Sequence, residues 1–229
     1  MTKGLFKDFI REIRKTLGRF LSIFIIVLLG VSFFSGVKAS APDMRHSADM
    51  YFDEYNMTDI RVLSTLGLTE DDIEEISKID GVESVQPGYF IDAVSMIGSV
   101  EMVFRVHSLP EGSKKGESFI NEINLLEGRL PEKSGECVLE ESNIINKGLK
   151  IGDTITLSSG TDTDIKEESL KENTFTIVGI GTSPYYLSYE KGSSEIGGGS
   201  VDLFLYIPEE DFKYEVYLEA LVTVEGGRE

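Results

Sequence analysis

An apolar stretch from Phe20 to Val37, FLSIFIIVLLGVSFFSGV, constrains this chain more than any other feature of its sequence. It lies between Arg19 and Lys38 and carries no charge, and its only polar side chains are serines. As a helix it would be roughly 27 Å long, which nearly matches the roughly 30 Å hydrocarbon core of a bilayer. Because a helix satisfies its own backbone hydrogen bonds in lipid, we expect residues 20–37 to cross a membrane.

Charge is divided unequally around this stretch. Residues 1–19 carry six cations and two anions, a net charge of +4, whereas the residues after 19 carry 16 cations and 38 anions, a net charge of −22. The basic flank of a spanning helix stays in the cytoplasm. We therefore expect a single span in the cell membrane, a cytoplasmic N-terminus and an extracytoplasmic C-terminal domain.

A cleaved signal peptide is the alternative for the same segment. Ala39-Ser40-Ala41 has the A-x-A form of a cleavage site, and a basic region precedes the apolar run. The run is longer than the apolar region of about 7–15 residues in an ordinary signal sequence, and the basic region before it is long and patterned. These two features favour retention as a membrane helix.

Residues 1–19 are predicted to form an amphipathic elbow helix in the cytoplasm. Apolar residues recur there at steps of three and four, at Phe6, Phe9, Ile10, Ile13 and Leu17. Such a helix lies in the membrane interface with its cations at the head groups. The alternative is a basic flank that only sets topology, and the apolar stripe favours the interfacial helix.

The composition excludes several function classes. The chain is 41% hydrophobic and 10% aromatic, which indicates a folded protein, and its net charge of −18 argues against nucleic-acid binding. Cys137 is the only cysteine, so no disulfide can form within the chain. His46 and His107 are the only histidines, which disfavours histidine-based zinc sites and catalytic triads. The sequence therefore predicts no catalytic, cofactor-binding or metal-binding residues.

Beyond the span, the pattern predicts a stalk at 38–58 and a mixed α+β domain at 59–229. In the stalk, Pro42 is expected to start a new helix or to kink the first one. A strand at 59–64 precedes a helix at 68–79, in which Thr69 and Asp72 form a capping box. The next strand is expected to begin at 82–85 and to resume at 89–97, before a hairpin turn at Gly98-Ser99. A helical turn is expected at 142–147, and further strands at 100–106, 136–139, 149–157, 174–180, 201–207 and 216–224.

Several polar segments interrupt this pattern. Residues 110–118 are a possible boundary between two subdomains. The acidic loop 158–173 contains Asp162 and Asp164, which could hold a cation, but it lacks the other ligands of an EF-hand, so a solvated loop is favoured. The glycine-rich loop 192–199 has no Gly-Lys-Ser/Thr and is interpreted as a mobile surface loop. Near it, Tyr185, Tyr186 and Tyr189 either form a contact surface or pack against the sheet.

The order of motifs resembles a known family. EGRLPEKSGECVLEE at 127–141 is followed by GLKIGDTITL at 148–157 and FTIVGI at 175–180, all behind a basic elbow helix and a first span. This arrangement resembles the permease subunits of MacB-like and FtsX-like ABC transporters, and SPYYLSYEKGSSEIGGGS with YIPEEDF resembles a bacterial branch of it. Each motif alone is weak, whereas their order over essentially the whole chain is moderately specific.

The resemblance implies a non-catalytic permease subunit of the mechanotransmission type. Its implied partners are a cytoplasmic ABC ATPase, a second permease copy and the lipid bilayer. Because this sequence contains no Walker motif, ATP hydrolysis is expected in the separate ATPase. Family members carry further spans after the external domain, so the chain is expected to be the N-terminal part of a permease. The alternative is a membrane-anchored or secreted module that binds or senses a ligand outside the cytoplasm.

Overall fold

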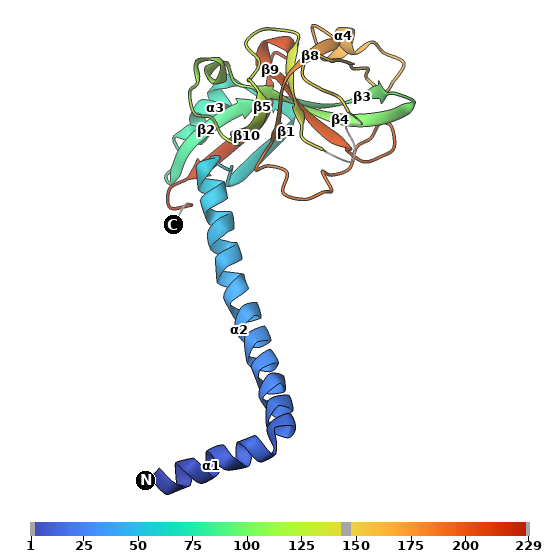
Figure 1. The fold of residues 1–229 in the computed structure, drawn as a ribbon. Helices are drawn as coiled ribbons and strands as arrows, with labels where there is room; N and C mark the ends of the chain where they lie inside the picture. Colours follow the sequence, from blue (N-terminus) through green and yellow to red (C-terminus); the bar gives the residue numbers. More distant parts are fainter. Residues whose placement is uncertain (1–2, 143–147, 228–229) are drawn as a thin grey trace. The chain divides into compact units, whose positions relative to one another are not determined.

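The computed structural model describes residues 3–142 and 148–227 (Figure 1). The chain divides into two compact units, Met1–Met50 and Tyr51–Glu229, and we call the second unit the lobe. The helical turn expected at 142–147 falls on 143–147, which lie outside the described residues.

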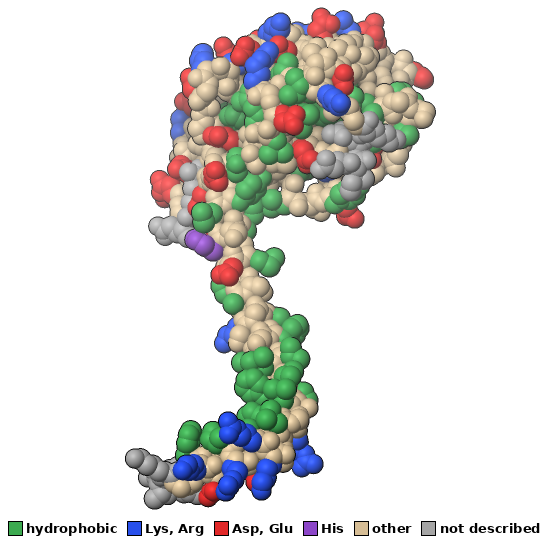
Figure 2. Space-filling model, in the orientation of Figure 1, with side chains coloured by type: hydrophobic (Ala, Val, Ile, Leu, Met, Phe, Trp, Pro, Cys, Tyr) green, Lys and Arg blue, Asp and Glu red, His purple; other side chains and the backbone are tan. Residues whose placement is uncertain are grey.

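Two helices make up the first unit, α1 (Lys3–Lys15) and α2 (Leu17–Glu54). They meet at Thr16, whose hydroxyl and amide both donate to the carbonyl of Glu12, at 3.0 and 3.1 Å. The most apolar part of α2 is long and apolar enough to cross a membrane, and none of its residues is buried. Figure 2 shows hydrophobic side chains around this part and basic side chains along α1.

The stalk does not form a separate helix. α2 continues from the apolar stretch through Pro42 to Glu54, so the span and most of the predicted stalk are one element. Pro42 removes one backbone donor from the helix without ending it. The last turn of α2, from Tyr51, belongs to the lobe.

The lobe is mostly β-structure, with short helices in its connections. Its strands are β1 (Ile60–Leu68), β2 (Val82–Gly88), β3 (Phe90–Ile97), β4 (Val100–Leu109), β5 (Asn124–Gly128), β6 (Glu136–Glu140), β7 (Thr154–Thr156), β8 (Thr174–Thr182), β9 (Leu203–Pro208) and β10 (Tyr217–Val224). Its helices are α3 (Glu70–Ser77), α4 (Ile165–Glu168) and the 3-10 turns η1 (Glu111–Lys115) and η2 (Glu209–Asp211). The predicted α+β class is confirmed.

The strands form two sheets. The three-stranded sheet has the order β1-β10-β2 and is antiparallel throughout, so the last strand in the sequence pairs with the first two. The seven-stranded sheet has the order β3-β4-β9-β6-β8-β5, with β7 added on β8. Two of its pairs, β4 with β9 and β6 with β8, are parallel.

Two sequence expectations are corrected here. Residues 82–97 form two strands in different sheets, not one interrupted strand, because the chain leaves the edge strand β2 just after Pro87 and Gly88. Proline is tolerated at such an edge, where its missing donor breaks no ladder. Residues 110–118 do not separate two subdomains, since the seven-stranded sheet takes strands from both sides of that segment.

The helix expected at 68–79 is shorter, at Glu70–Ser77, but its start is confirmed. Thr69 and Asp72 form the predicted capping box, in which each side chain accepts from the other residue's backbone amide. Leu68 belongs instead to β1, which extends beyond the predicted 59–64.

Two glycines of the family motifs lie against each other in the seven-stranded sheet. Gly128 in β5 pairs with Gly179 in β8, and a Cβ added at Gly128 would lie 2.1 Å from the carbonyl oxygen of Val178. A Cβ at Gly179 would lie 2.4 Å from the carbonyl oxygen of Arg129. The segments EGR and VGI therefore need glycine because their backbones approach too closely for any side chain.

Candidate functional site

The end of α2 is fastened to the segment 119–122 of the lobe. Asn56 has a left-handed backbone with φ 50°, and its carbonyl accepts from the amide of Asn121 at 2.8 Å. The Tyr55 carbonyl accepts from the amide of Glu122 at 2.9 Å, and the Asn56 side-chain amide donates to the carbonyl of Phe119 at 3.1 Å. These bonds satisfy carbonyls that a helix C-terminus leaves unpaired.

The next residues are fastened to β10. The amide of Asp59 donates to the carbonyl of Val222 at 3.0 Å, and the Asp59 carboxylate accepts from the amide of Val224 at 2.9 Å. The Thr58 hydroxyl also donates to the Val222 carbonyl, at 3.2 Å. Residues 55–59, which we call the anchor, thus connect α2 to two separate parts of the lobe.

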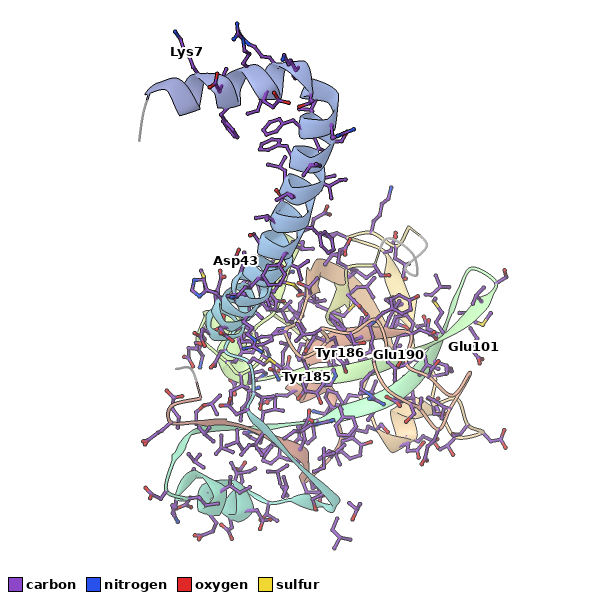
Figure 3. All side chains as sticks on the ribbon, turned by 90° about the horizontal axis from the view of Figure 1, so that it is seen from below. Lys7, Asp43, Glu101, Tyr185, Tyr186 and Glu190 are labelled. Atoms are coloured by element: carbon purple, nitrogen blue, oxygen red, sulfur yellow. The ribbon has the colours of Figure 1, made fainter. Side chains whose placement is uncertain are left out.

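A group of buried and half-buried polar and aromatic side chains lies between the two sheets. We call it the joint cluster, and it consists of Arg61, His107, Tyr185, Tyr186, Tyr206 and Glu219. Arg61 and Glu219 come from the three-stranded sheet, and His107 and Tyr206 come from the seven-stranded sheet. Tyr185 and Tyr186 come from the connection between β8 and β9, and Figure 3 labels both within the lobe.

Glu219 connects the two sheets electrostatically. Its carboxylate pairs with Arg61 at 2.5 Å and faces the His107 Nδ1 at 3.8 Å. The His107 Nε2 lies 2.6 Å from the hydroxyl of Tyr186, and the His107 ring stacks on Tyr206 with centroids 5.3 Å apart. His107, Tyr206 and Glu219 are buried, whereas Arg61 and Tyr186 are half-buried.

Burial and charge set the protonation states in the joint cluster. Burial lowers the pKa of His107 by disfavouring the imidazolium, and this outweighs the attraction of Glu219. Burial alone would raise the pKa of Glu219, but His107 and Arg61 hold it below its ordinary value. The cluster at neutral pH therefore holds a neutral His107 beside an ionised Glu219 paired with Arg61.

The ring of Phe90 lies beside two arginines. The guanidinium carbon of Arg61 is 4.5 Å from its centroid, and that of Arg105 is 5.9 Å away, so both are within cation–π range. Arg105 makes a bidentate pair with Asp92 at 2.7 and 2.9 Å and also donates to the carbonyl of Ser193 at 3.0 Å. The chain between β8 and β9 is thereby connected to β3 and β4.

A cavity of about 20 Å³ lies between the anchor and the joint cluster. Asn121, which is bonded to the anchor, lines it together with His107, Tyr185 and Glu219. Its volume is enough for about one water molecule. The cavity therefore cannot hold an organic substrate.

A larger groove, of about 500 Å³, lies along residues 189–193 and 199–202. Lys191, one of its lining residues, makes an ion pair with Glu140, with Nζ 3.1 Å from the carboxylate. Tyr189 forms one wall and is 69% exposed. The groove is open to solvent and can accept a ligand from outside.

The comparisons with known proteins place the chain in a family. The family model of the MacB-like periplasmic core domain matches residues 16–227. The chain belongs to the MacB-like periplasmic core domain family. The resemblance seen in the sequence is confirmed, and this family is part of ABC transporter permeases.

The chain is also similar to parts of solved structures. The periplasmic region of MacB from Actinobacillus actinomycetemcomitans has 15% identity and a TM-score of 0.42, over 72% of this chain and 67% of that chain. The extracellular domain of the noncanonic ABC-type transporter YknZ from Gram-positive bacteria has 13% identity and a TM-score of 0.40, over 72% and 76%. No curated protein matches this MacB-like chain.

Among the described residues, the MacB-like domain has no group of three metal-ligating side chains. Asp164 caps α4 by accepting from the amide of Lys166 at 2.9 Å, which gives this residue of the acidic loop a structural use. In the glycine-rich loop, Ser193 bridges to Ser200, and the carbonyl of Ser193 is held by Arg105.

Sequence reasoning missed most of the joint cluster in this MacB-like domain. It proposed Tyr185, Tyr186 and Tyr189 as a contact surface or as packing residues; the structure half-buries Tyr185 and Tyr186 and exposes Tyr189. His107 and Glu219 carried no motif. The only available signal was a histidine and a glutamate inside otherwise apolar strand segments.

Proposed function

We propose that this chain is a membrane permease subunit of an ABC transporter of the mechanotransmission type. In this proposal, nucleotide binding by a cytoplasmic ATPase moves the spanning helix, and the helix moves the lobe. Family membership supports the permease assignment, because the matched domain is that of such permeases. The chain itself would not be an enzyme, and it would act with the ATPase and a second permease copy.

The proposed topology places residues 1–19 in the cytoplasm, 20–37 in the cell membrane and 59–229 outside. The charge asymmetry supports it, since the basic flank of a span is retained in the cytoplasm. Residues 38–58 would connect the membrane to the lobe as the continuation of α2 as far as Glu54.

The anchor is the observation that carries the mechanical part of the proposal. A displacement of the membrane helix reaches the lobe only if the connection between them does not itself bend or unfold. α2 is one helix from Leu17 to Glu54, and residues 55–59 are hydrogen-bonded both to segment 119–122 and to β10. β1 begins directly after the anchor and carries Arg61 into the joint cluster. A displacement of α2 would therefore reach the contact between the two sheets.

The test replaces Ser40, Ala41, Pro42 and Asp43 with four glycines and, as a matched control, with four alanines. Alanine favours a helix, whereas each glycine costs about 1 kcal/mol relative to alanine. Spin labels on the lobes of a reconstituted permease–ATPase complex report the change in lobe-to-lobe distance on addition of ATP. We expect the alanine variant to keep this change and the glycine variant to lose it. A glycine variant that responds like the parent chain contradicts the mechanical coupling.

The groove along residues 189–202 favours one second candidate, a binding or sensing module without an ATPase. Its volume and its exposed Tyr189 suit a ligand from outside the cytoplasm. Co-purification discriminates the two functions. A permease subunit retains a co-expressed ABC ATPase in detergent, whereas a sensing module does not.

A further inference from the structure

α1 carries an apolar stripe and a cationic stripe on different sides of one helix. At 3.6 residues per turn, the apolar stripe covers about 100° of the helix circumference and consists of Phe6, Phe9, Ile10 and Ile13. The cationic stripe also covers about 100° and consists of Lys7, Arg11, Arg14 and Lys15. The centres of the two stripes are about 140° apart around the helix axis. Phe6 is 70% exposed and Phe9 is 60% exposed. Lys7 projects outward from α1 (Figure 3).

Nothing in the described part of the chain stabilises either stripe. Among the described residues, no ion pair involves the four cations. A helix of 13 residues is marginal in water by itself. Its stability must therefore come from a surface that accepts apolar side chains and cations together.

The position of α1 in the sequence limits what that surface can be. Only Thr16 separates α1 from α2, and the apolar run of α2 begins at Phe20. α1 therefore ends where the proposed span meets the cytoplasmic head groups. A zwitterionic interface would bury the apolar stripe but has no net negative charge to attract the cations, whereas an anionic leaflet satisfies both stripes.

We infer that α1 is a docking element for anionic phospholipid in the cytoplasmic leaflet, held by its four exposed cations and its apolar stripe. The inference rests on the proposed membrane span. It adds a lipid class to that proposal and predicts that the conformation of the elbow depends on membrane charge.

The chain contains no tryptophan, so one introduced tryptophan reports on α1 without background. Phe9→Trp places the probe in the apolar stripe. Gly4→Trp places it on the cationic side, where an added Cβ meets nothing within 4 Å, and keeps the charge unchanged. The full chain is reconstituted in vesicles of phosphatidylcholine, with or without phosphatidylglycerol, and quenching by brominated lipid measures probe depth.

We expect phosphatidylglycerol to increase the quenching of Phe9→Trp and to leave Gly4→Trp poorly quenched. High salt should remove the increase, because the Debye length falls to about 3 Å at 1 M. Adding Lys7→Gln, Arg11→Gln and Arg14→Gln to Phe9→Trp should abolish the response to phosphatidylglycerol. The matched pair Asp8→Asn and Glu12→Gln should keep it.

Equal quenching of Phe9→Trp in both lipids overturns the inference. Shielding that appears only when the ATPase is added overturns it too, because the partner of α1 would then be a protein. Resistance to alkaline extraction is measured on the same samples. A chain that resists extraction but shows no lipid-charge response refutes only this inference, whereas an extractable chain refutes the proposed span.

Discussion

The hydroxyl of Tyr186 lies 2.6 Å from the Nε2 of His107, and this contact connects the β8–β9 segment to β4 inside the lobe. Tyr186 also stacks on Phe204, with centroids 4.9 Å apart and an interplanar angle of 11°. The tyrosine therefore packs on Phe204 through its ring and provides a hydrogen-bond partner for His107 through its hydroxyl. The two contributions can be separated by mutation.

Tyr186→Phe should keep the stacking on Phe204 and leave the Nε2 of the buried His107 without the Tyr186 hydroxyl as its hydrogen-bond partner. We expect the free energy of unfolding to fall by about 1–3 kcal/mol, the typical cost of one unsatisfied buried group. Urea titration of the full chain in detergent, followed by circular dichroism, measures it. Tyr189→Phe is the matched control because Tyr189 is mostly exposed, and it should leave the midpoint unchanged. Equal effects of the two variants would contradict the role of the hydroxyl.

Arg61→Met should leave the buried carboxylate of Glu219 without its arginine partner. Removing one partner of a buried pair typically costs about 3–5 kcal/mol. The double variant Arg61→Met with Glu219→Gln should recover part of this loss, since no uncompensated charge remains. Lys78→Met, which breaks exposed pairs on the surface, is the control and should change little. A double variant as unstable as the sum of the single ones would refute the coupling.

The stability of the lobe should fall as the pH falls from 7.5 to 5.5. Because the pKa of His107 is lowered on folding, the unfolded chain binds more protons near pH 6.5 and gains stability relative to the folded chain as the pH decreases. Glu219 has a lowered pKa as well, so its contribution is present at higher pH and is lost only below about 4.5.

The pH prediction is checked with His107→Gln, which should flatten the dependence of the unfolding midpoint between pH 7.5 and 5.5. His46→Gln, on the exposed part of α2, should retain the parent profile. The groups facing His107 are Glu219, Arg61, Arg105 and the neighbouring tyrosines, and none of them has an ordinary pKa inside this window. A parent profile that is already flat would show that His107 does not lose its proton on folding.

Gly128→Ala should destabilise the lobe strongly, because the new Cβ would lie 2.1 Å from the Val178 carbonyl oxygen at a backbone φ of 81°. Gly81→Ala is the matched control, with φ 87° and open space around the position. The control should lose about 1–2 kcal/mol from its left-handed backbone alone. We expect Gly128→Ala to lose clearly more in the same urea titration. Similar losses would mean that the two strands can separate at little cost.

The elements encoded by local patterns could be predicted from the sequence. The apolar run, the capping box of Thr69 and Asp72 and the turn at Gly98-Ser99 all depend on residues close together in the chain. Each has a physical signal of its own, namely hydropathy, helix capping and turn chemistry. The family motifs reflect close backbone contact, as Gly128 and Gly179 illustrate.

The sheet order and the joint cluster could not be predicted because they depend on pairing between distant segments. The sequence of residues 216–224 predicts a strand but not that this strand, β10, lies between β1 and β2. His107 and Glu219 are separated by most of the lobe sequence, and single charged residues in strands usually face solvent. That α2 continues through Pro42 could not be predicted either, because proline normally ends or kinks a helix.

The place of β10 in its sheet has a consequence for biogenesis. β1 and β2 are made early during synthesis, yet they pair with each other only through a strand made some 130 residues after Gly88. During synthesis both early strands remain exposed edges until Tyr217–Val224 has been made. The lobe is thus completed by its final strand, beside the anchor, and a nascent chain interrupted before that point would offer its open edges to chaperones and proteases.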